Sequence, residues 1–319
     1  MPALRIVFMG TAELACASLK ALVAEKSFEV SAVVTQPDRP RGRDLKLQPS
    51  PVKAVALDLD LPVLQPERAR HEAFLAELRT LRPDLIVVAA YGQILPPALL
   101  EIPRFGCVNL HTSLLPKYRG AAPIQWAILN GDAETGVTIM KVDAGLDTGD
   151  ILTQAPTPIA PADNAQTLHD RLAVMGAELL VRTIPDYVAG KLTSRPQPAE
   201  GATYARKITK EDGALDWSQP ARTLWNRVRG LTPWPGTFTW QKAVPRPRLL
   251  KIWEVAPMEA PVGMPGEVLQ ADKQGLVVAC GQGALRILNL QREGGRRLPA
   301  AEFLIGYPLG VGEQLGGTA

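Results

Sequence analysis

Histidine, cysteine and long apolar stretches are all scarce in this sequence. Three of its 319 residues are histidine and three are cysteine, and Cys16, Cys107 and Cys280 lie far apart. Their spacing forms neither a disulfide framework nor a pattern of metal ligands, so we expect no bound metal and a reducing, cytoplasmic environment. No apolar run approaches the length of about 18 residues that a membrane span requires, which argues against a membrane protein.

The first 25 residues lack the pattern of a targeting segment. Glu13 falls inside the apolar stretch that would form its core, and no basic segment precedes that stretch. Leu4–Met9 is instead typical of a strand that begins almost at the first residue. We therefore expect no presequence.

Charge is distributed unevenly along the chain. Residues 1–190 contain 18 Lys and Arg against 21 Asp and Glu, a net charge of −3, whereas residues 191–319 contain 17 against 11, a net charge of +6. A basic C-terminal third on an acidic body indicates a polyanionic partner, although a solvated basic surface would give the same count.

The N-terminal part of the chain alternates short apolar runs with amphipathic segments. This is the pattern of βαβ units, and it predicts an α/β fold with a Rossmann-like, doubly wound, mostly parallel sheet. We expect strands at 4–10, 29–35, 84–90, 106–112, 135–142 and 151–159, and helices at about 13–24, from 50, at 69–81, at 124–131 and at 166–188.

The last third of the chain has a different composition. Gly190–Thr203 is polar and rich in Pro and Gly, as interdomain linkers are. We therefore predict a catalytic domain over 1–189, a linker over 190–206 and a C-terminal domain over 207–319. After a helix at about 220–229, short strand-like runs are typical of a small β-barrel: 236–240, 249–255, 266–270, 275–280 and 284–290.

Two polar residues interrupt the apolar run at 106–112. Side chains alternate across a strand, so Asn109 and His111 project to the same face. Ligands of open parallel sheets bind outside the carboxyl ends of the strands, where this pair lies. The alternative is that the two side chains only satisfy the backbone of the following loop.

A loop with three aspartates, Asp143-Ala-Gly-Leu-Asp147-Thr-Gly-Asp150, separates two later strands. Asp and Gly favour turns, which is one interpretation, and the loop lacks the distal glutamate of an EF-hand calcium site. A sharper hypothesis is that Asp147 meets His111 and sets its tautomer, while Asn109 donates hydrogen bonds to a developing oxyanion.

Two common kinds of chemistry are not indicated. No cysteine or serine nucleophile motif accompanies His111, so covalent catalysis has little support. Gly10–Ala15 departs from the G-x-G-x-x-G fingerprint, so a nicotinamide cofactor is not expected.

Asn109, His111 and Asp147, set in NLHTSLLPKYRGAAPIQWAI and DAGLDTGD, closely resemble the formyltransferase superfamily that uses formyltetrahydrofolate. The resemblance combines an N-x-H strand end, an S-L-L-P loop and a D-x-G-x-D-T-G loop. Within that superfamily, the chain from about Leu4 to Gly312 is similar to the methionyl-tRNA formyltransferases. This implies transfer of the formyl group of 10-formyltetrahydrofolate to the α-amine of initiator methionyl-tRNA, for translation initiation.

The resemblance implies roles for particular residues. Asn109 and His111 would flank the formyl carbon, and Asp147 would assist proton transfer from the amine. The folate pocket would be lined by Tyr91, Gly92, Gln93, Ile94, Leu95, Ser113, Leu114, Leu115 and Pro116. Ordinary core packing is the alternative for the leucines.

The same resemblance gives the basic residues a role. Thr35–Lys53 resembles the loop that holds the acceptor end of the tRNA, and its prolines predict an extended conformation. Tyr204–Ser218 and Leu231–Phe238 resemble the start of an OB-like C-terminal domain that binds tRNA. The implied tRNA contacts are Arg39, Arg41, Arg43, Lys46, Arg206, Lys207 and Lys210, with Arg43 as the first candidate for the acceptor end.

Three other functions share some of these features. A formyltransferase for a small amine, such as a ribonucleotide or an amino-sugar nucleotide, would need neither the basic loop nor the basic C-terminal domain. A formyltetrahydrofolate hydrolase would use water as the acceptor, and a non-catalytic tRNA-binding protein would not need Asn109, His111 and Asp147. The sequence does not define an oligomeric state, and we favour a monomer.

Overall fold

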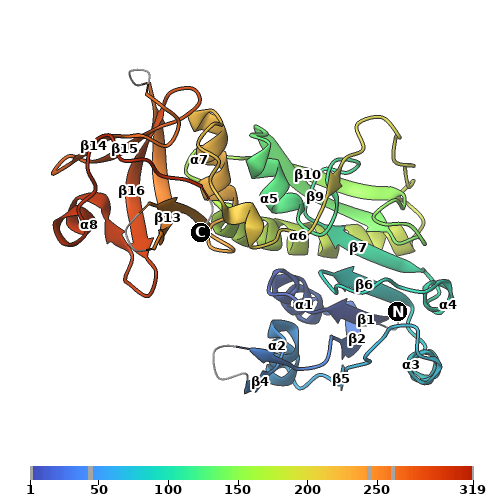
Figure 1. Cartoon of the computed structure of the whole chain (residues 1–319). Helices are drawn as coiled ribbons and strands as arrows, with labels where there is room; N and C mark the ends of the chain where they lie inside the picture. The colour runs from blue at the N-terminus through green and yellow to red at the C-terminus, as the bar shows by residue number, and fades with distance from the viewer. Residues whose placement is uncertain (1–2, 42–45, 243–245, 260–262, 318–319) are drawn as a thin grey trace. The chain divides into compact units, whose positions relative to one another are not determined.

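The computed structural model describes residues 3–41, 46–242, 246–259 and 263–317 (Figure 1). The chain divides into two compact units. Unit 1 comprises residues 1–123, 134–158 and 169–205, and unit 2 comprises residues 124–133, 159–168 and 206–319. Two short stretches before residue 169 thus belong to unit 2, which the composition did not indicate.

Unit 1 contains a seven-stranded sheet with the order β10-β9-β7-β6-β1-β2-β5. The five strands from β7 to β5 in this order are parallel, β9 is antiparallel to β7, and β10 is antiparallel to β9. The predicted Rossmann-like, mostly parallel sheet is therefore confirmed. Its strands are β1 (Leu4–Gly10), β2 (Phe28–Val34), β5 (Val63–Leu64), β6 (Leu85–Ala89), β7 (Cys107–His111), β9 (Glu134–Lys141) and β10 (Ile151–Pro158).

The strands β1 and β6 of this sheet are largely apolar on both sides because helices cover both faces of the sheet. In β1, Val7 and Met9 pack with Phe74 and Leu75 in one cluster, while Phe8 on the other face is also fully buried. Burial on both faces explains why these strands are continuous apolar runs and do not alternate with polar residues. The helices are α1 (Leu14–Ala24), α2 (Pro51–Asp58), α3 (Glu72–Thr80), α4 (Pro97–Leu100) and α6 (Ala165–Val188).

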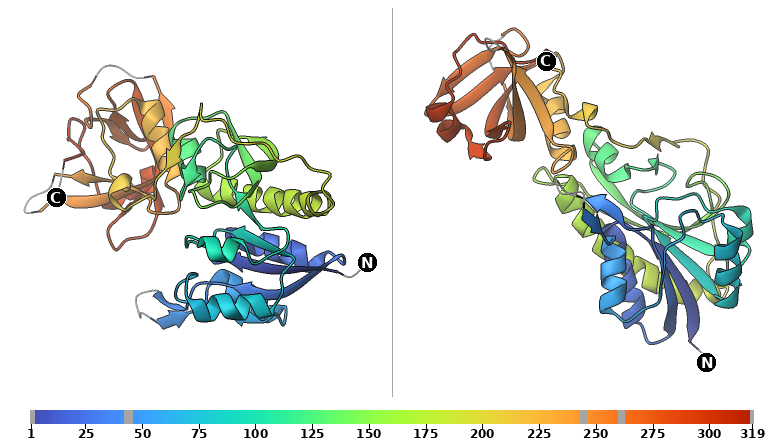
Figure 2. Two further views of the ribbon diagram at one scale, coloured as in Figure 1. Left: turned by 90° about the vertical axis from the view of Figure 1, so that its right-hand side faces the viewer. Right: turned by 60° about the horizontal axis from the view of Figure 1, so that its bottom comes forward.

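The long helix α6 lies along the sheet, as both views of Figure 2 show. Gly176 of this helix faces Leu110 of β7 so closely that a Cβ at position 176 would lie 2.6 Å from Leu110 Cδ1. The absence of a side chain at Gly176 therefore allows helix α6 to pack closely against Leu110 of β7. Among the described residues, no helix combines the length and hydropathy that a bilayer crossing requires.

Residues 190–205, which the composition predicts to be a linker, run along unit 1. Ile151 and Arg195 exchange two backbone hydrogen bonds of 2.8 and 2.9 Å. Further on, β11 (Tyr204–Ala205) pairs in parallel with β8 (Arg119–Gly120). The segment lacks long regular elements, as expected of a linker, but it is attached to the sheet domain by backbone pairing.

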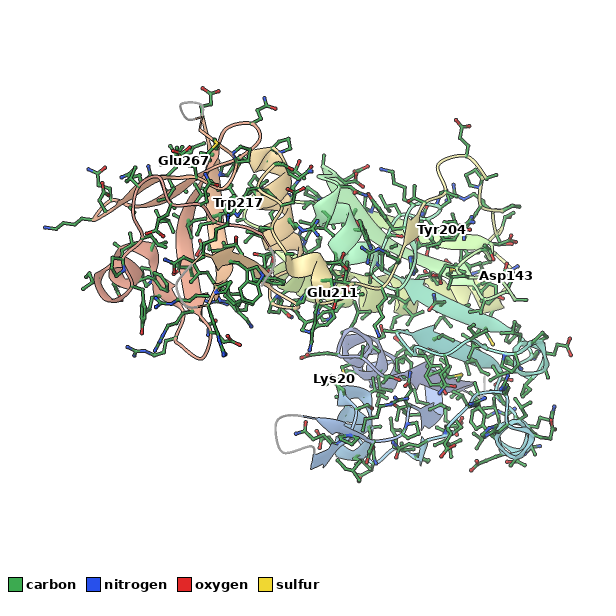
Figure 3. All side chains as sticks on the ribbon, in the orientation of Figure 1. Lys20, Asp143, Tyr204, Glu211, Trp217 and Glu267 are labelled. Atoms are coloured by element: carbon green, nitrogen blue, oxygen red, sulfur yellow. The ribbon has the colours of Figure 1, made fainter. Side chains whose placement is uncertain are left out.

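Unit 2 contains a six-stranded antiparallel sheet with the order β12-β13-β16-β15-β14, in which β17 also pairs with β16. Trp217, labelled in Figure 3, lies in its core with Leu224, Val268 and Leu285. The expected β-rich C-terminal domain is confirmed. Its elements are β12 (Thr237–Gln241), β13 (Arg248–Met258), β14 (Val268–Asp272), β15 (Gly275–Ala279), β16 (Ala284–Arg292), β17 (Leu298–Pro299), a short 3-10 helix η1 (Glu211–Gly213), α7 (Ala221–Gly230) and α8 (Ala300–Gly306).

The two edge strands of this sheet, β12 and β14, are joined by the last described residues of the chain. Val268 N donates to Glu313 O at 2.8 Å, and Gly316 N donates to Trp240 O at 2.8 Å. The segment between them thus connects both open edges, which is how barrel-like domains remove exposed edges. The helix α5 (Pro123–Leu129), apart from its first residue, belongs to the same unit.

Candidate active site

The carboxyl ends of β1, β6 and β7 meet at one edge of the unit 1 sheet. From β1 the chain proceeds outward to β2 and β5, and from β6 it proceeds in the other direction to β7. Such a reversal of strand order creates a crevice, which is the usual ligand site of open α/β sheets. The loop after β6 is fixed there, because Tyr91 O accepts hydrogen bonds from Thr11 Oγ1 and from Gln36 Nε2, both at 2.9 Å.

The structure brings the side chains of Asn109, His111 and Asp147 together at this edge. His111 Nδ1 lies 3.7 Å from Asp147 Oδ2, and Asn109 Nδ2 lies 3.5 Å from Asp147 Oδ1. Both distances are longer than those of a typical hydrogen bond. Asp147 therefore faces both predicted partners without being tightly bound to either.

The tautomer of His111 follows from the contact of its other ring nitrogen. Nε2 lies 2.9 Å from the backbone oxygen of Tyr118. A carbonyl oxygen only accepts hydrogen bonds, so Nε2 carries the proton, and Nδ1 of the neutral ring has a free lone pair. His111 is 6% exposed. The site thus holds a buried imidazole whose Nδ1 faces the Asp147 carboxylate.

The conformation of Asp147 is unusual for a residue other than glycine. Its φ angle is +52°, in the left-handed region, and its Oδ2 accepts a hydrogen bond of 2.8 Å from Gly120 N. The loop around it is tight, since a Cβ at Gly149 would lie 1.9 Å from Lys141 O. A left-handed aspartate persists only where surrounding contacts fix it, and such residues are enriched at functional sites.

The other two aspartates of the loop have structural contacts. Asp143, labelled in Figure 3, accepts hydrogen bonds from Gly145 N at 3.0 Å and from Thr148 Oγ1 at 2.8 Å. Asp150 Oδ2 accepts one from Ser194 Oγ at 2.8 Å. Turn chemistry therefore accounts for Asp143. In the described part of the chain, no group of three or more His, Cys, Asp or Glu side chains is placed to hold a metal ion.

The loop after β6 contains the residues 91–95, which the family resemblance implies to line the folate pocket. Ile94 is 86% exposed, whereas Leu95 packs in the core beside Tyr91. Gln93 binds backbone groups, since its Oε1 accepts from Ala69 N and its Nε2 donates to Glu67 O. Gly92 is exposed, with a φ of +80°.

Tyr91 has a buried hydroxyl group. The side chain is 2% exposed, and burial raises the pKa of its hydroxyl to about 12. Among the residues that the structure describes, Tyr91 Oη has no hydrogen-bond partner. Buried polar atoms are normally paired, so this neutral hydroxyl is a group that a ligand or water could satisfy.

The loop Ser113–Pro116 is fixed by hydrogen bonds with side chains of the neighbouring strands β9 and β10. Thr138 Oγ1 donates to Ser113 O at 2.6 Å and accepts from Leu115 N at 3.2 Å. Gln154 Nε2 donates to Leu115 O at 2.9 Å. Leu115 is buried and clusters with other apolar side chains, whereas Leu114 and Pro116 are half-buried. Core packing thus accounts for Leu115.

A surface pocket of about 610 Å³ lies at the opposite edge of the sheet, near the amino ends of β1 and β6. It does not include any residue of the predicted site. Its lining residues are Arg5, Arg79, Arg82, Pro83, Asp84, Ala98, Glu101, Ile102 and Arg104. Because ligands of this fold class bind at the carboxyl ends of the strands, the hollow is not the expected active site.

The basic loop after β2 is only partly described. Arg43 lies outside the described residues. Arg41 and Lys46 pair through their backbones in a two-stranded ribbon of β3 (Arg39–Arg41) and β4 (Lys46–Gln48). Arg39 is exposed, and its Nη2 donates to Gln36 Oε1 at 3.2 Å. The extended conformation expected of this loop is therefore seen at 39–41 and 46–48, whereas Pro51–Lys53 begin the helix α2.

The basic residues at the start of the C-terminal part differ in their contacts. Arg206 Nη1 donates to Asp212 Oδ2 at 2.9 Å, and its guanidinium lies 5.1 Å from the centre of the Trp126 ring, within unit 2. Lys207 and Lys210 are exposed. Arg206 thus stabilises unit 2, while the two lysines present their charges to solvent.

The Arg206–Asp212 pair predicts a pH-dependent stability of unit 2. Hydrogen bonds from Arg206 hold the pKa of the Asp212 carboxyl well below its usual range. A lowered folded-state pKa adds stability that is complete above the unfolded value of about 3.9. This stability declines as the pH drops below that value and is lost as the pH falls through the lower folded-state pKa. Asp212→Asn is therefore expected to lower the Tm of unit 2 by several degrees at pH 7. The Tm difference between wild type and variant should become smaller as the pH is lowered from 5 to 3.

Thermal unfolding of unit 2 can be followed by tryptophan fluorescence, because all six tryptophans of the chain lie within the bounds of this unit. Glu259→Gln, an exposed carboxylate of the same unit, serves as the control and should leave the Tm unchanged. A Tm difference for Asp212→Asn that stays constant down to pH 3 would contradict the assignment.

Sequence reasoning missed three groups that shape this site. The Tyr118 carbonyl and the Gly120 amide are backbone groups, and no residue type signals them. Gln197, whose side chain binds the backbone of the Asp147 loop, lies in the Pro-rich segment whose composition suggests a linker. Only the path of that segment along unit 1 reveals its role.

Comparisons with known proteins agree with this fold. Residues 4–184 match the family described as Formyl transferase, and residues 207–308 match Formyl transferase, C-terminal domain. Methionyl-tRNA formyltransferase of Geobacter sulfurreducens is 51% identical over 316 residues, covering 99% of this chain and 98% of that protein. That of Caldanaerobacter subterraneus subsp. tengcongensis is 51% identical over 311 residues, covering 97% and 99%.

Solved structures with lower identity share the fold. WlaRD, a sugar 3N-formyl transferase, has a TM-score of 0.65 at 19% identity and covers 92% of this chain and 98% of that one. HypX from Aquifex aeolicus, solved with tetrahydrofolic acid, has a TM-score of 0.63 at 20% identity over 97% of this chain. The match covers 48% of HypX, so the present chain spans about half of that protein. From the family matches and the full-length identity of about half, this chain belongs to the formyl transferase family and groups with its methionyl-tRNA formyltransferases.

Proposed function

We propose that this protein transfers the formyl group of 10-formyltetrahydrofolate to the α-amino group of initiator methionyl-tRNA. The observation that carries the proposal is the free Nδ1 of His111, which faces Asp147 while Nε2 is occupied by the Tyr118 carbonyl. The names of the full-length relatives support the acceptor. The identity of donor and acceptor comes from the family, and the geometry of the site supports the proposed roles of the residues.

His111 is suited to take the proton that the attacking amine must lose. A neutral amine attacks the formyl carbon, and its nitrogen releases a proton as the new C–N bond forms. In the proposed reaction His111 Nδ1 accepts that proton. The resulting imidazolium donates through Nε2 to Tyr118 O, and its charge lies next to the Asp147 carboxylate.

Asn109 is suited to stabilise the charge on the formyl oxygen. Attack on the carbonyl carbon places negative charge on that oxygen, and a preorganised N–H donor stabilises it. The Asn109 amide has two hydrogens, one of which is directed at Asp147 Oδ1. The other remains for the formyl oxygen. The bond from the formyl carbon to the folate nitrogen then breaks, and that nitrogen takes up a proton.

The loop after β6 fits the folate, which supplies the formyl group. The exposed side chain of Ile94 offers an apolar contact for a flat ring, and backbone groups from Tyr91 to Gln93 can bind polar ring edges. Leu95 and Leu115 are buried, so in this proposal they support the folate-binding loops from the core and do not contact the ring.

The tRNA is proposed to contact basic residues of both units. Residues 207–319 form the proposed tRNA-binding domain, and Lys207 and Lys210 are its exposed candidates for phosphate contacts. The loop Thr35–Lys53, with Arg39, Arg41, Arg43 and Lys46, is proposed to bind the acceptor end. Arg206 would act indirectly, because Asp212 occupies its guanidinium.

The experiment that tests the function follows a labelled formyl group from 10-formyltetrahydrofolate to three acceptors: methionyl-tRNA, free methionine and water. We expect label in formylmethionyl-tRNA and little in formylmethionine or formate. Formate release that is independent of tRNA would identify a hydrolase. Label in neither tRNA nor formate would favour a small-amine acceptor and reject the proposal.

Lys207 and Lys210 predict a salt-dependent contribution to tRNA binding. Replacing both by glutamine is expected to weaken binding and to reduce the slope of log Kd against log salt by about 2, since each lost phosphate contact removes about one released counterion. Binding assays from about 50 to 200 mM salt would measure this slope. Lys191→Gln with Lys20→Gln, two exposed lysines of unit 1, is the control pair. An unchanged slope in the Lys207/Lys210 variant would contradict the assignment.

A further inference from the structure

The side chain of Gln197 binds the backbone of the loop that carries Asp147. Its Nε2 donates to Asp147 O at 2.9 Å and to Gly149 O at 2.8 Å. Both carbonyls follow the Cα of Asp147, the residue in the left-handed conformation. One amide group therefore satisfies two carbonyl oxygens of a tight turn and fixes their separation.

The orientation of Gln197 is in turn set by Arg119. Arg119 Nε and Nη2 both donate to Gln197 Oε1, at 3.0 and 2.8 Å. Arg119 is 9% exposed and lies in β8 next to Gly120, whose amide donates to the Asp147 carboxylate. With its oxygen held by the guanidinium, Gln197 must direct its NH₂ group at the Asp147 loop.

The segment around Gln197 is fastened to the same loop at further points. Ser194 Oγ donates to Asp150 Oδ2 at 2.8 Å, and Lys141 Nζ donates to Ser194 Oγ at 3.0 Å. The backbone of Arg195 pairs with Ile151. Residues 194–197 thus follow the loop from Ile151 back to Asp147, and Gln197 is the member that binds at Asp147 itself.

We propose that Gln197 is a positioning residue that holds Asp147 in its left-handed conformation and so directs its carboxylate at His111. This inference rests on the proposed function for its effect on rate. Without the two hydrogen bonds, Asp147 can relax to an ordinary conformation and withdraw its carboxylate from His111 Nδ1. Misplacement by about 1 Å can cost up to about 10²-fold in rate, so the effect is large enough to measure.

Gln197→Glu separates positioning from folding. The glutamate keeps the length of the side chain and an oxygen for the buried Arg119, so the variant is expected to fold. It removes the N–H donors, and its second oxygen repels the carbonyls of Asp147 and Gly149. Gln197→Met, which has similar length and no charge, checks that the effect does not arise from the new negative charge. We expect both variants to lower kcat by about 10–100-fold with KM for methionyl-tRNA changed less than about 3-fold.

A double-mutant cycle with Asp147→Ala distinguishes positioning from a general structural role. If Gln197 acts through the Asp147 carboxylate, Gln197→Glu should change kcat by less than about 2-fold once that carboxylate is absent. If Gln197→Glu lowers kcat by the same factor in the wild type and in Asp147→Ala, Gln197 acts independently of Asp147 and the proposal is overturned.

Hydrogen exchange of peptides spanning residues 143–150 provides a measurement that needs no substrate. Exchange there is expected to be at least about 10-fold faster in Gln197→Glu and Gln197→Met than in the wild type, and unchanged in Thr193→Ala, an exposed polar residue of the same segment. Unchanged exchange in both Gln197 variants would overturn the proposal. Wild-type protein that fails to formylate methionyl-tRNA would instead reject the proposed function, and the exchange result would still decide whether Gln197 fixes the loop.

Discussion

Replacement of His111 by alanine is expected to lower kcat for formyl transfer by about 10²–10⁴-fold, the usual contribution of a general base. The reason is that Nδ1 is the ring nitrogen free to accept a proton, while Nε2 donates to the Tyr118 carbonyl. The KM for methionyl-tRNA should change little, because the buried ring offers little surface to so large a substrate. Single-turnover formyl transfer measures the effect on the chemical step directly.

His169→Ala is a matched control for this experiment. His169 Nδ1 lies 2.9 Å from Asp170 Oδ1, so this variant also removes an imidazole that is paired with a carboxylate, but at a position on α6. Its formylation rate should equal that of the wild type. His111→Gln tests the alternative that His111 only binds the loop backbone, because the glutamine amide can reach the position of Nε2 and still donate to Tyr118 O. Full activity in His111→Gln would refute the role of His111 as a base.

Local patterns were sufficient to predict the sheet and one half of the site. The runs that form β1 and β6 are largely apolar on both sides, and only strands covered on both faces have this pattern. Period-two alternation placed Asn109 and His111 on one face without any knowledge of the fold. The strand-end position then followed from the general behaviour of parallel sheets.

The rest of the site depends on contacts that no local pattern encodes. Tyr118 contributes a carbonyl oxygen and Gly120 an amide, and every residue except proline has both groups. Gln197 lies 50 residues from Asp147, in a stretch whose prolines suggested only a linker. Such long-range partners become visible only once the chain is folded.

The division of the chain into units has a similar cause. Residues 159–168 follow a strand of unit 1, yet they belong to unit 2. Arg229 of α7 donates from Nη1 to Ala160 O at 3.1 Å and from Nε to Asn226 Oδ1 at 3.1 Å. The predicted boundary used composition, which changes near residue 190, whereas the contact between Arg229 and Ala160 joins residues 69 positions apart.

Asp147→Asn is expected to lower kcat by about 10²-fold or more while leaving the loop in place. Asparagine tolerates the left-handed conformation about as well as aspartate, and its Oδ1 can still accept the hydrogen bond from Gly120 N. What it loses is the negative charge beside His111 Nδ1, so the protonated imidazole loses its neighbouring counter-charge. Formyl-transfer assays together with hydrogen exchange over residues 143–150 would check both parts of this expectation.

Asp147→Gly completes the comparison, because glycine adopts a φ of +52° at no steric cost. If the carboxylate charge matters, Asp147→Gly and Asp147→Asn should both be slow. If Asp147 serves only to shape the turn, Asp147→Gly should retain nearly full activity, and the proposed role of the carboxylate would be wrong. Asp143→Asn is the control from the same loop: its side chain binds Gly145 N and Thr148 Oγ1, contacts that an asparagine oxygen can also accept, so its activity should stay within about 3-fold of the wild type. The pair Asp143 and Asp147 therefore separates the aspartate that forms a turn from the one that faces the reacting groups.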